Sequence, residues 1–114
     1  MKLAIVGSRN WTNQSPIYNA LQELKPTLVI SGGALGVDTI AILAADYFNI
    51  PTKVFKPDWV KYGKKAGAVR NAEMVKECDK LIAFWDGQSK GTKISIDLAT
   101  KARKLLRVET EPKK

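Results

Sequence analysis

Short apolar runs alternate along this chain with longer stretches in which apolar and polar residues are mixed. The short runs are typical of strands buried in a parallel sheet, and they predict strands at 3–6, 28–30, 53–55, 80–85 and 105–108. Apolar residues at helical spacing between them predict helices at 16–24, 37–48, 66–78 and 91–104. We expect Ser15 to be the N-cap of the first helix, and the connection 56–64 to be a binding loop.

The order of these elements predicts the fold class. Strands that alternate with helices through short connections form a parallel sheet with helices on both faces. We therefore predict a three-layer α/β/α sandwich with a five-stranded parallel sheet, in the order 3-2-1-4-5. In that order the loops after Val6 and Trp85 meet at the switch point between the first and fourth strands. We expect one domain over residues 1–110, followed by a frayed basic tail at 111–114.

Three glycine-bearing loops, at 7–9, 31–38 and 86–92, each follow a predicted strand and precede a helical stretch. Backbone amides approach a phosphate closely where no Cβ intervenes, and the first amides of a helix lack intrahelical acceptors. In an open parallel sheet, such loops all lie at the carboxyl edge of the strands. Their repetition predicts a phosphate site built from several loops.

The composition excludes several kinds of site. The chain has no histidine and one cysteine, Cys78, so an internal disulfide is excluded. A zinc site and a Ser-His-Asp triad are not expected, and we predict no metal. Any proton transfer would then depend on carboxylates, lysine, tyrosine or water.

The net charge of +8 indicates anionic partners by its sign. Most of the lysines are scattered along the chain, which favours a solvated basic surface over a nucleic-acid track. The apolar start of the chain is too short for the core of a signal peptide, and the chain has no apolar run long enough for a membrane helix. We therefore expect a cytoplasmic protein with no membrane partner.

Motifs that occur in order along most of the chain point to a known family. They are Gly7-Ser8-Arg9, Ser31-Gly32-Gly33-Ala34-x-Gly36-x-Asp38, Asp58-Trp59 with Tyr62-Gly63, Ala66-Gly67, Arg70-Asn71-x-x-Met74 and Phe84-Trp85-Asp86-Gly87-x-Ser89-x-Gly91-Thr92. Together they resemble the SLOG superfamily of SMF/DprA and LOG proteins, and specifically its small YspA-like branch. The resemblance implies a Rossmann-like fold that binds nucleotides or nucleotide-derived ligands.

On this resemblance, the glycine loops would hold phosphate, with Ser8 and Arg9 near the ribose or a second phosphate. Arg70 would add a charged, bidentate hydrogen-bond donor. The indoles of Trp59 and Trp85 would offer stacking faces for a base. The full set of expected ligand contacts is Gly7, Ser8, Arg9, Ser31, Gly32, Gly33, Gly36, Asp38, Trp59, Arg70, Asn71, Trp85, Asp86, Gly87, Ser89, Gly91 and Thr92.

Two departures argue against the LOG reaction. Ser95 stands where LOG-type phosphoribohydrolases carry a glutamate that assists cleavage of the N-glycosidic bond, and Asn71 replaces a lysine. The nearby Asp97 lies on another side of the predicted helix from Ser95, so it does not simply replace that glutamate. If the protein is an enzyme, its candidate acid-base groups are Asp38, Asp86 and Asp97.

Three functions remain open at this point. The first is a protein that binds a nucleotide-derived ligand as sensor, carrier or sequestering protein, requires no cofactor and forms a homo-oligomer. The second is a nucleotide N-glycoside hydrolase of the LOG type. The third, which the basic charge and the likeness to the DprA branch suggest, is a single-stranded nucleic-acid-binding protein.

Overall fold

The computed structural model describes residues 1–110, so the predicted basic tail at 111–114 lies outside the described residues. Its sheet has the order β3-β2-β1-β4-β5, and every neighbouring pair of strands is parallel. The strands are β1 (Lys2–Gly7), β2 (Leu28–Ser31), β3 (Thr52–Val54), β4 (Lys80–Phe84) and β5 (Leu105–Glu109). The helices are α1 (Ser15–Leu24), α2 (Val37–Tyr47), α3 (Trp59–Tyr62), α4 (Ala66–Glu77) and α5 (Lys90–Lys101). The predicted fold class and strand order are confirmed.

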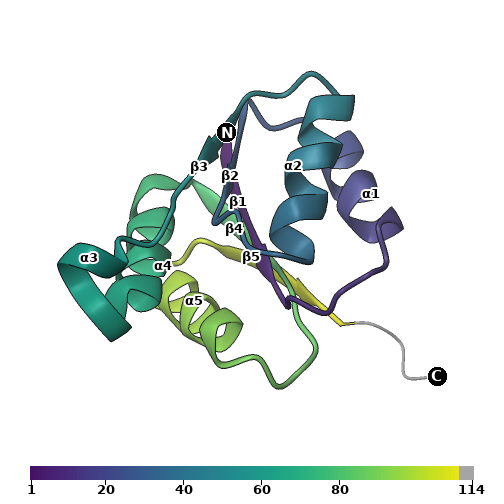
Figure 1. Cartoon of the computed structure of the whole chain (residues 1–114). Coiled ribbons are helices and arrows are strands. Elements are labelled where there is room, and N and C mark those ends of the chain that lie inside the picture. Colours follow the sequence, from purple (N-terminus) through teal and green to yellow (C-terminus); the bar gives the residue numbers. More distant parts are fainter. Residues whose placement is uncertain (111–114) are drawn as a thin grey trace.

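Helices cover both faces of the sheet, with α1 and α2 on one side and α4 and α5 on the other (Figure 1). The alternation of side chains along β1 explains the two layers. Leu3 and Ile5 pack toward α1 and α2, whereas Ala4 and Val6 pack toward α4 and α5. After the exposed lysine at the start of each, the central strands β1 and β4 are apolar, because both of their faces are buried.

Three local predictions differ from the structure. The N-cap of α1 is Gln14 rather than Ser15, and Ser15 is the first helical residue. The connection at 56–64 contains the short helix α3 and the beginning of a 3-10 turn (Gly63–Lys65). The last helix ends at Lys101 instead of Lys104, whose ammonium donates to the carbonyls of Val75 and Lys76 at the end of α4.

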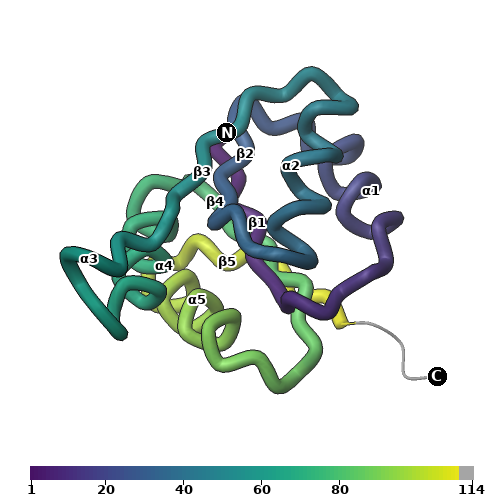
Figure 2. The backbone as a smooth tube through the Cα atoms, viewed as in Figure 1, coloured from purple at the N-terminus to yellow at the C-terminus, as the bar shows by residue number. Residues whose placement is uncertain are grey.

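The carboxyl ends of β1, β2 and β4 bring the three glycine loops together, as the backbone path in Figure 2 shows. Ser8 connects them. Its amide donates to the carbonyl of Phe84, its carbonyl accepts from the amide of Val37, and its hydroxyl accepts from the amide of Asp86 at 2.9 Å. Over residues 1–110, no helix has the length and apolar character needed to span a bilayer.

Candidate functional site

A groove with two lobes lies at this edge of the sheet. The first lobe has a volume of about 450 Å³. Its lining includes nine of the predicted contacts, Gly7, Arg9, Asp38, Arg70, Asn71, Asp86, Ser89, Gly91 and Thr92, together with Val6, Asn10, Ala34, Met74 and Ser95. The second lobe, of about 550 Å³, is lined by Gly32, Gly33, Lys56, Pro57, Trp59, Gly67, Ala68 and Ile94 and shares Arg9, Ala34, Arg70, Asn71 and Gly91 with the first.

The start of α5 forms one wall of the first lobe. The amides of Lys90, Gly91 and Thr92 are first-turn amides, so they have no acceptor within the helix. Thr92 and Ser95 are 6% and 1% exposed, and their hydroxyls form no hydrogen bond with any part of residues 1–110. Since no buried side-chain oxygen or nitrogen of the described residues lacks a hydrogen-bond partner, these two hydroxyls are accessible from the groove, where a polar ligand group can reach them.

Gly91 leaves this helix start open to a ligand. A Cβ at Gly91 would meet one neighbour, the side-chain nitrogen of Asn71 at 4.0 Å. The same Asn71 nitrogen donates to the carbonyl of Gly91 at 3.2 Å, which holds the start of α5 against α4. The missing Cβ therefore leaves space for a ligand at the start of α5, and the hydrogen bond from Asn71 fixes the backbone there.

The loop between β4 and α5 is held by Asp86. Its carboxylate accepts hydrogen bonds from the amides of Gln88 and Ser89 and from the Ser89 hydroxyl, at 2.8 to 3.0 Å. These hydrogen bonds, led by the Gln88 amide, lower the pKa of Asp86. A carboxylate with a lowered pKa is a poor proton donor, so Asp86 has the features of a structural group in this loop.

In the loop between β2 and α2, backbone amides donate hydrogen bonds to side chains of nearby residues. The Gly33 amide donates to the Ser31 hydroxyl at 3.3 Å, and the Ala34 amide donates to the carboxylate of Asp38 at 3.1 Å. Asp38 thus occupies part of the position in which phosphate was expected on the Gly32–Gly33 turn. This arrangement favours the start of α5 as the phosphate position.

Asp38 is the buried carboxylate of the groove, at 7% exposure. Burial raises its pKa from the ordinary value of 3.8 to about 6, while the Ala34 amide and the positive charges of Arg70 and Arg9 act in the opposite direction. Among the three predicted acid-base candidates, Asp38 has a raised pKa and lines the first lobe.

The two arginines of the groove have different environments. The Nη1 atom of Arg70 donates to the carbonyls of Gly32 at 2.8 Å and Phe55 at 3.4 Å, and its Nε donates to Asn71. Arg9 lines both lobes and forms no ion pair within residues 1–110. Arg70 therefore holds loops in place as well as contributing charge, whereas Arg9 is available to an anion.

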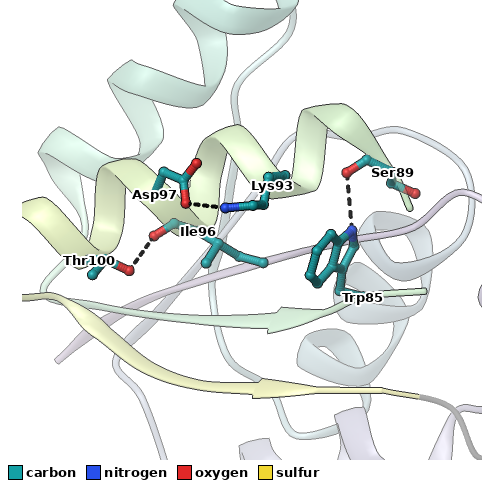
Figure 3. A network of polar contacts seen from close by, with 6 residues as sticks. All are labelled: Trp85, Ser89, Lys93, Ile96, Asp97 and Thr100. Atoms are coloured by element: carbon teal, nitrogen blue, oxygen red, sulfur yellow. Dashed lines mark hydrogen bonds and ion pairs between the residues drawn. The ribbon is translucent and has the colours of Figure 1, made fainter. Parts of the chain in front are cut away.

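Five of the predicted contacts do not line either lobe: Ser8, Ser31, Gly36, Trp85 and Gly87. Ser8 is buried beneath the groove, and a Cβ at Gly36 would meet the Ser8 carbonyl, so both positions serve the packing of the loops. Figure 3 shows the indole of Trp85 at the start of α5, where its nitrogen donates to the Ser89 carbonyl at 3.1 Å. This hydrogen bond and the packing of Trp85 against the core beneath α5 give it a structural position, and its stacking role stays a prediction from the sequence.

Asp97 is also outside the groove. It is paired with Lys93 at 2.7 Å, one turn earlier on the same helix, and its side chain is 59% exposed (Figure 3). Its carboxylate lines neither lobe of the groove, and its role as an acid-base group stays a prediction from the sequence.

Asn10, Lys56 and Ser95 line the groove although the sequence motifs did not predict them as contacts. A signal was present for Ser95, which lies three residues after Thr92 and therefore shares its face of α5. Lys56 had no such signal, because its position depends on the path of the connection into α3. Within residues 1–110, no three histidine, cysteine or acidic side chains come together as a metal site.

The fold and the groove define a parallel α/β protein with a cleft at the switch point of its sheet. A sequence model of the YspA, cpYpsA-related SLOG family matches residues 1–62. The gene 61 protein of Mycobacterium phage D29 is 37% identical over 112 residues, which cover 89% of this chain and 90% of that protein. The chain belongs to the YspA, cpYpsA-related SLOG family.

Two solved structures of DNA processing protein A have the same fold. The protein from Helicobacter pylori, whose structure was described for its single-stranded DNA binding mode, matches with a TM-score of 0.76 and 24% identity. The protein from Streptococcus pneumoniae matches with a TM-score of 0.79 and 20% identity. This chain is covered at 100% and 99%, but it spans only 66% and 50% of those proteins.

Proposed function

We propose that the first lobe binds a phosphorylated, nucleotide-derived small molecule. The observation that carries this proposal is that Thr92 and Ser95, two residues that line the cleft, have hydroxyls that are accessible and form no hydrogen bond within residues 1–110. They lie beside the open amides at the start of α5, in a lobe that is also lined by Arg9, which forms no ion pair with another described residue. Amides, hydroxyls and a guanidinium are the donors that phosphate accepts from.

The same lobe has room and surfaces for the rest of a nucleotide. Its volume of about 450 Å³ is within the range of small-molecule sites, about 300–1,000 Å³. We assign the phosphate to the amides of Gly91 and Thr92, with Arg9 as counter-charge. The Ser95 hydroxyl and the apolar side chains of Val6 and Met74 then face the nucleoside.

We propose binding without hydrolysis, in a sensor, carrier or sequestering role. Cleavage of an N-glycosidic bond requires assistance to both the departing base and the developing cation on the sugar, and general acid-base assistance alone is worth about 10²–10⁴-fold. Asp97 is outside the groove, and Asp86 is engaged by three donors in its own loop. Among the described residues, Asp38 is then the one carboxylate of the groove whose raised pKa suits acid-base assistance.

A second candidate function is binding of single-stranded nucleic acid. The observation in its favour is the continuation of the groove into the second lobe, where Lys56 and the exposed indole of Trp59 are found. A cation beside an aromatic face is the usual arrangement for a single strand. The net charge of +8 agrees with such a ligand, and so does the single-stranded DNA binding described for the Helicobacter pylori protein.

Calorimetry with AMP, GMP, CMP and UMP, each compared with its nucleoside, tests the leading proposal. We expect at least one monophosphate to bind, and Thr92→Val to weaken it about 10- to 100-fold, the effect of a lost hydrogen bond to a charged group. Thr100→Val is the matched control, because the Thr100 hydroxyl lies on the same helix and donates to the Ile96 carbonyl outside the groove.

Two results would contradict the proposal. One is equal affinity of the wild-type protein and Thr92→Val for every monophosphate that binds. The other is no binding of any monophosphate together with tight binding of an oligothymidylate that weakens steeply with salt, which would establish the second candidate function.

A further inference from the structure

The charged and apolar surfaces of the groove are separated. Arg9, Arg70 and Gly91 belong to the wall that the two lobes share, so both guanidiniums and the start of α5 lie at the junction. The apolar surfaces lie to either side of the junction. Val6 and Met74 belong to the first lobe, and Pro57, Trp59 and Ile94 belong to the second. An anionic group fits the junction, and a ring system fits each side.

The second lobe has its own surface for a ring. Trp59 lines this lobe and is 58% exposed, which is unusual for a large aromatic side chain without a partner. It is the first residue of α3, which lies beside the start of α4 at the edge of the molecule (Figure 1). The Asp58 carboxylate caps this short helix by accepting from the Lys61 amide at 3.0 Å, so the position of the indole is supported locally.

The charges at the junction suit a diphosphate better than a single phosphate. Two guanidiniums and the positive end of α5 lie there, opposed by the carboxylate of Asp38, and Lys56 adds a cation in the second lobe. A mononucleotide in the first lobe would leave the Trp59 indole and the Lys56 ammonium without a ligand contact. A molecule with two ring systems would use both lobes.

We propose that the ligand of this groove is a dinucleotide in which a diphosphate joins two nucleosides. The diphosphate lies between Arg9, Arg70 and the start of α5. One nucleoside occupies the first lobe, and the base of the other stacks on Trp59. This proposal rests on the proposed function and extends it to the second lobe.

The test compares diadenosine diphosphate and diguanosine diphosphate with ADP and GDP by calorimetry. We expect a dinucleotide to bind at least about tenfold more tightly than the matching diphosphate, since stacking of one base contributes about 1–3 kcal/mol. Trp59→Ala removes this advantage and leaves the affinity for ADP and GDP unchanged, whereas Trp59→Phe retains most of it. Val60→Ala is the matched control, because Val60 is the next residue of α3, is fully exposed and does not line the lobe.

The outcomes separate this inference from the proposed function. Binding of ADP or GDP that depends on Thr92, with no further gain for either dinucleotide, overturns the dinucleotide proposal and leaves the proposed function in place. A dinucleotide advantage that persists in Trp59→Ala also overturns it. Absence of binding by all four compounds overturns the dinucleotide proposal, and absence of binding by AMP, GMP, CMP and UMP as well rejects the proposed function. A Trp59-dependent preference for oligothymidylate over the dinucleotides replaces both with nucleic-acid binding.

Discussion

The buried carboxylate of Asp38 provides a test of the site that needs no ligand. Burial raises the pKa of Asp38 from 3.8 to about 6 in the folded protein, so folding favours its protonated form. The resulting stability is fully present below about pH 3.8 and is lost as the pH rises through about 6. The difference between the two pKa values corresponds to about 3 kcal/mol at most, at about 1.4 kcal/mol per pH unit.

Asp38→Asn removes this titration while keeping an oxygen that accepts from the Ala34 amide. We expect the free energy of unfolding of the wild-type protein, relative to that of Asp38→Asn, to fall by about 2–3 kcal/mol between pH 4 and pH 8. Urea unfolding monitored by tryptophan fluorescence at several pH values measures this change. Asp97→Asn is the control, because the exposed pair of Asp97 with Lys93 contributes little, about 0–1 kcal/mol.

A difference between the wild-type protein and Asp38→Asn that stays constant from pH 4 to pH 8 would refute this reasoning about burial. A difference of the opposite sign would show that Arg9 and Arg70 stabilise the ionised carboxylate by more than burial penalises it.

Two further predictions concern the loops and the chemistry. Gly36→Ala should lower the melting temperature clearly more than Gly87→Ala. Both glycines have positive φ, at 76° and 84°, but only at Gly36 would the added Cβ meet backbone, namely the Ser8 carbonyl. Equal losses of melting temperature in the two variants would contradict this packing. AMP incubated with the protein should stay intact by chromatography; release of free adenine that is lost in Asp38→Asn would instead make Asp38 a catalytic group.

Local patterns were sufficient for the architecture. Apolar runs and helical spacing depend on the residues of one element, and the alternation of elements restricts a parallel sheet to few topologies. The strand order and the gathering of the glycine loops at one edge were therefore predictable. Helix α3 was missed because it has four residues, exposes Val60 and shows no apolar periodicity.

The roles of individual site residues depended on distant parts of the chain. The same motif places Asp86 on the groove and the indole of Trp85 beneath α5, which no spacing in the sequence distinguishes. Arg70 bonds to carbonyls 38 and 15 residues away, so its part in holding the loops follows from the packing of α4.

The sequence by itself predicted the family, the order of the strands and a site built from the glycine loops at their carboxyl ends, because each apolar run and each glycine motif is local and their order along the chain restricts the topology. Only the tertiary structure decided which donors a ligand can still reach. In the folded protein, the amides of Gly33 and Ala34 donate to the Ser31 hydroxyl and the Asp38 carboxylate. The hydroxyls of Thr92 and Ser95 have no hydrogen-bond partner in the described chain. The physical reason is that a hydrogen-bond donor is available only when no other part of the fold has taken it.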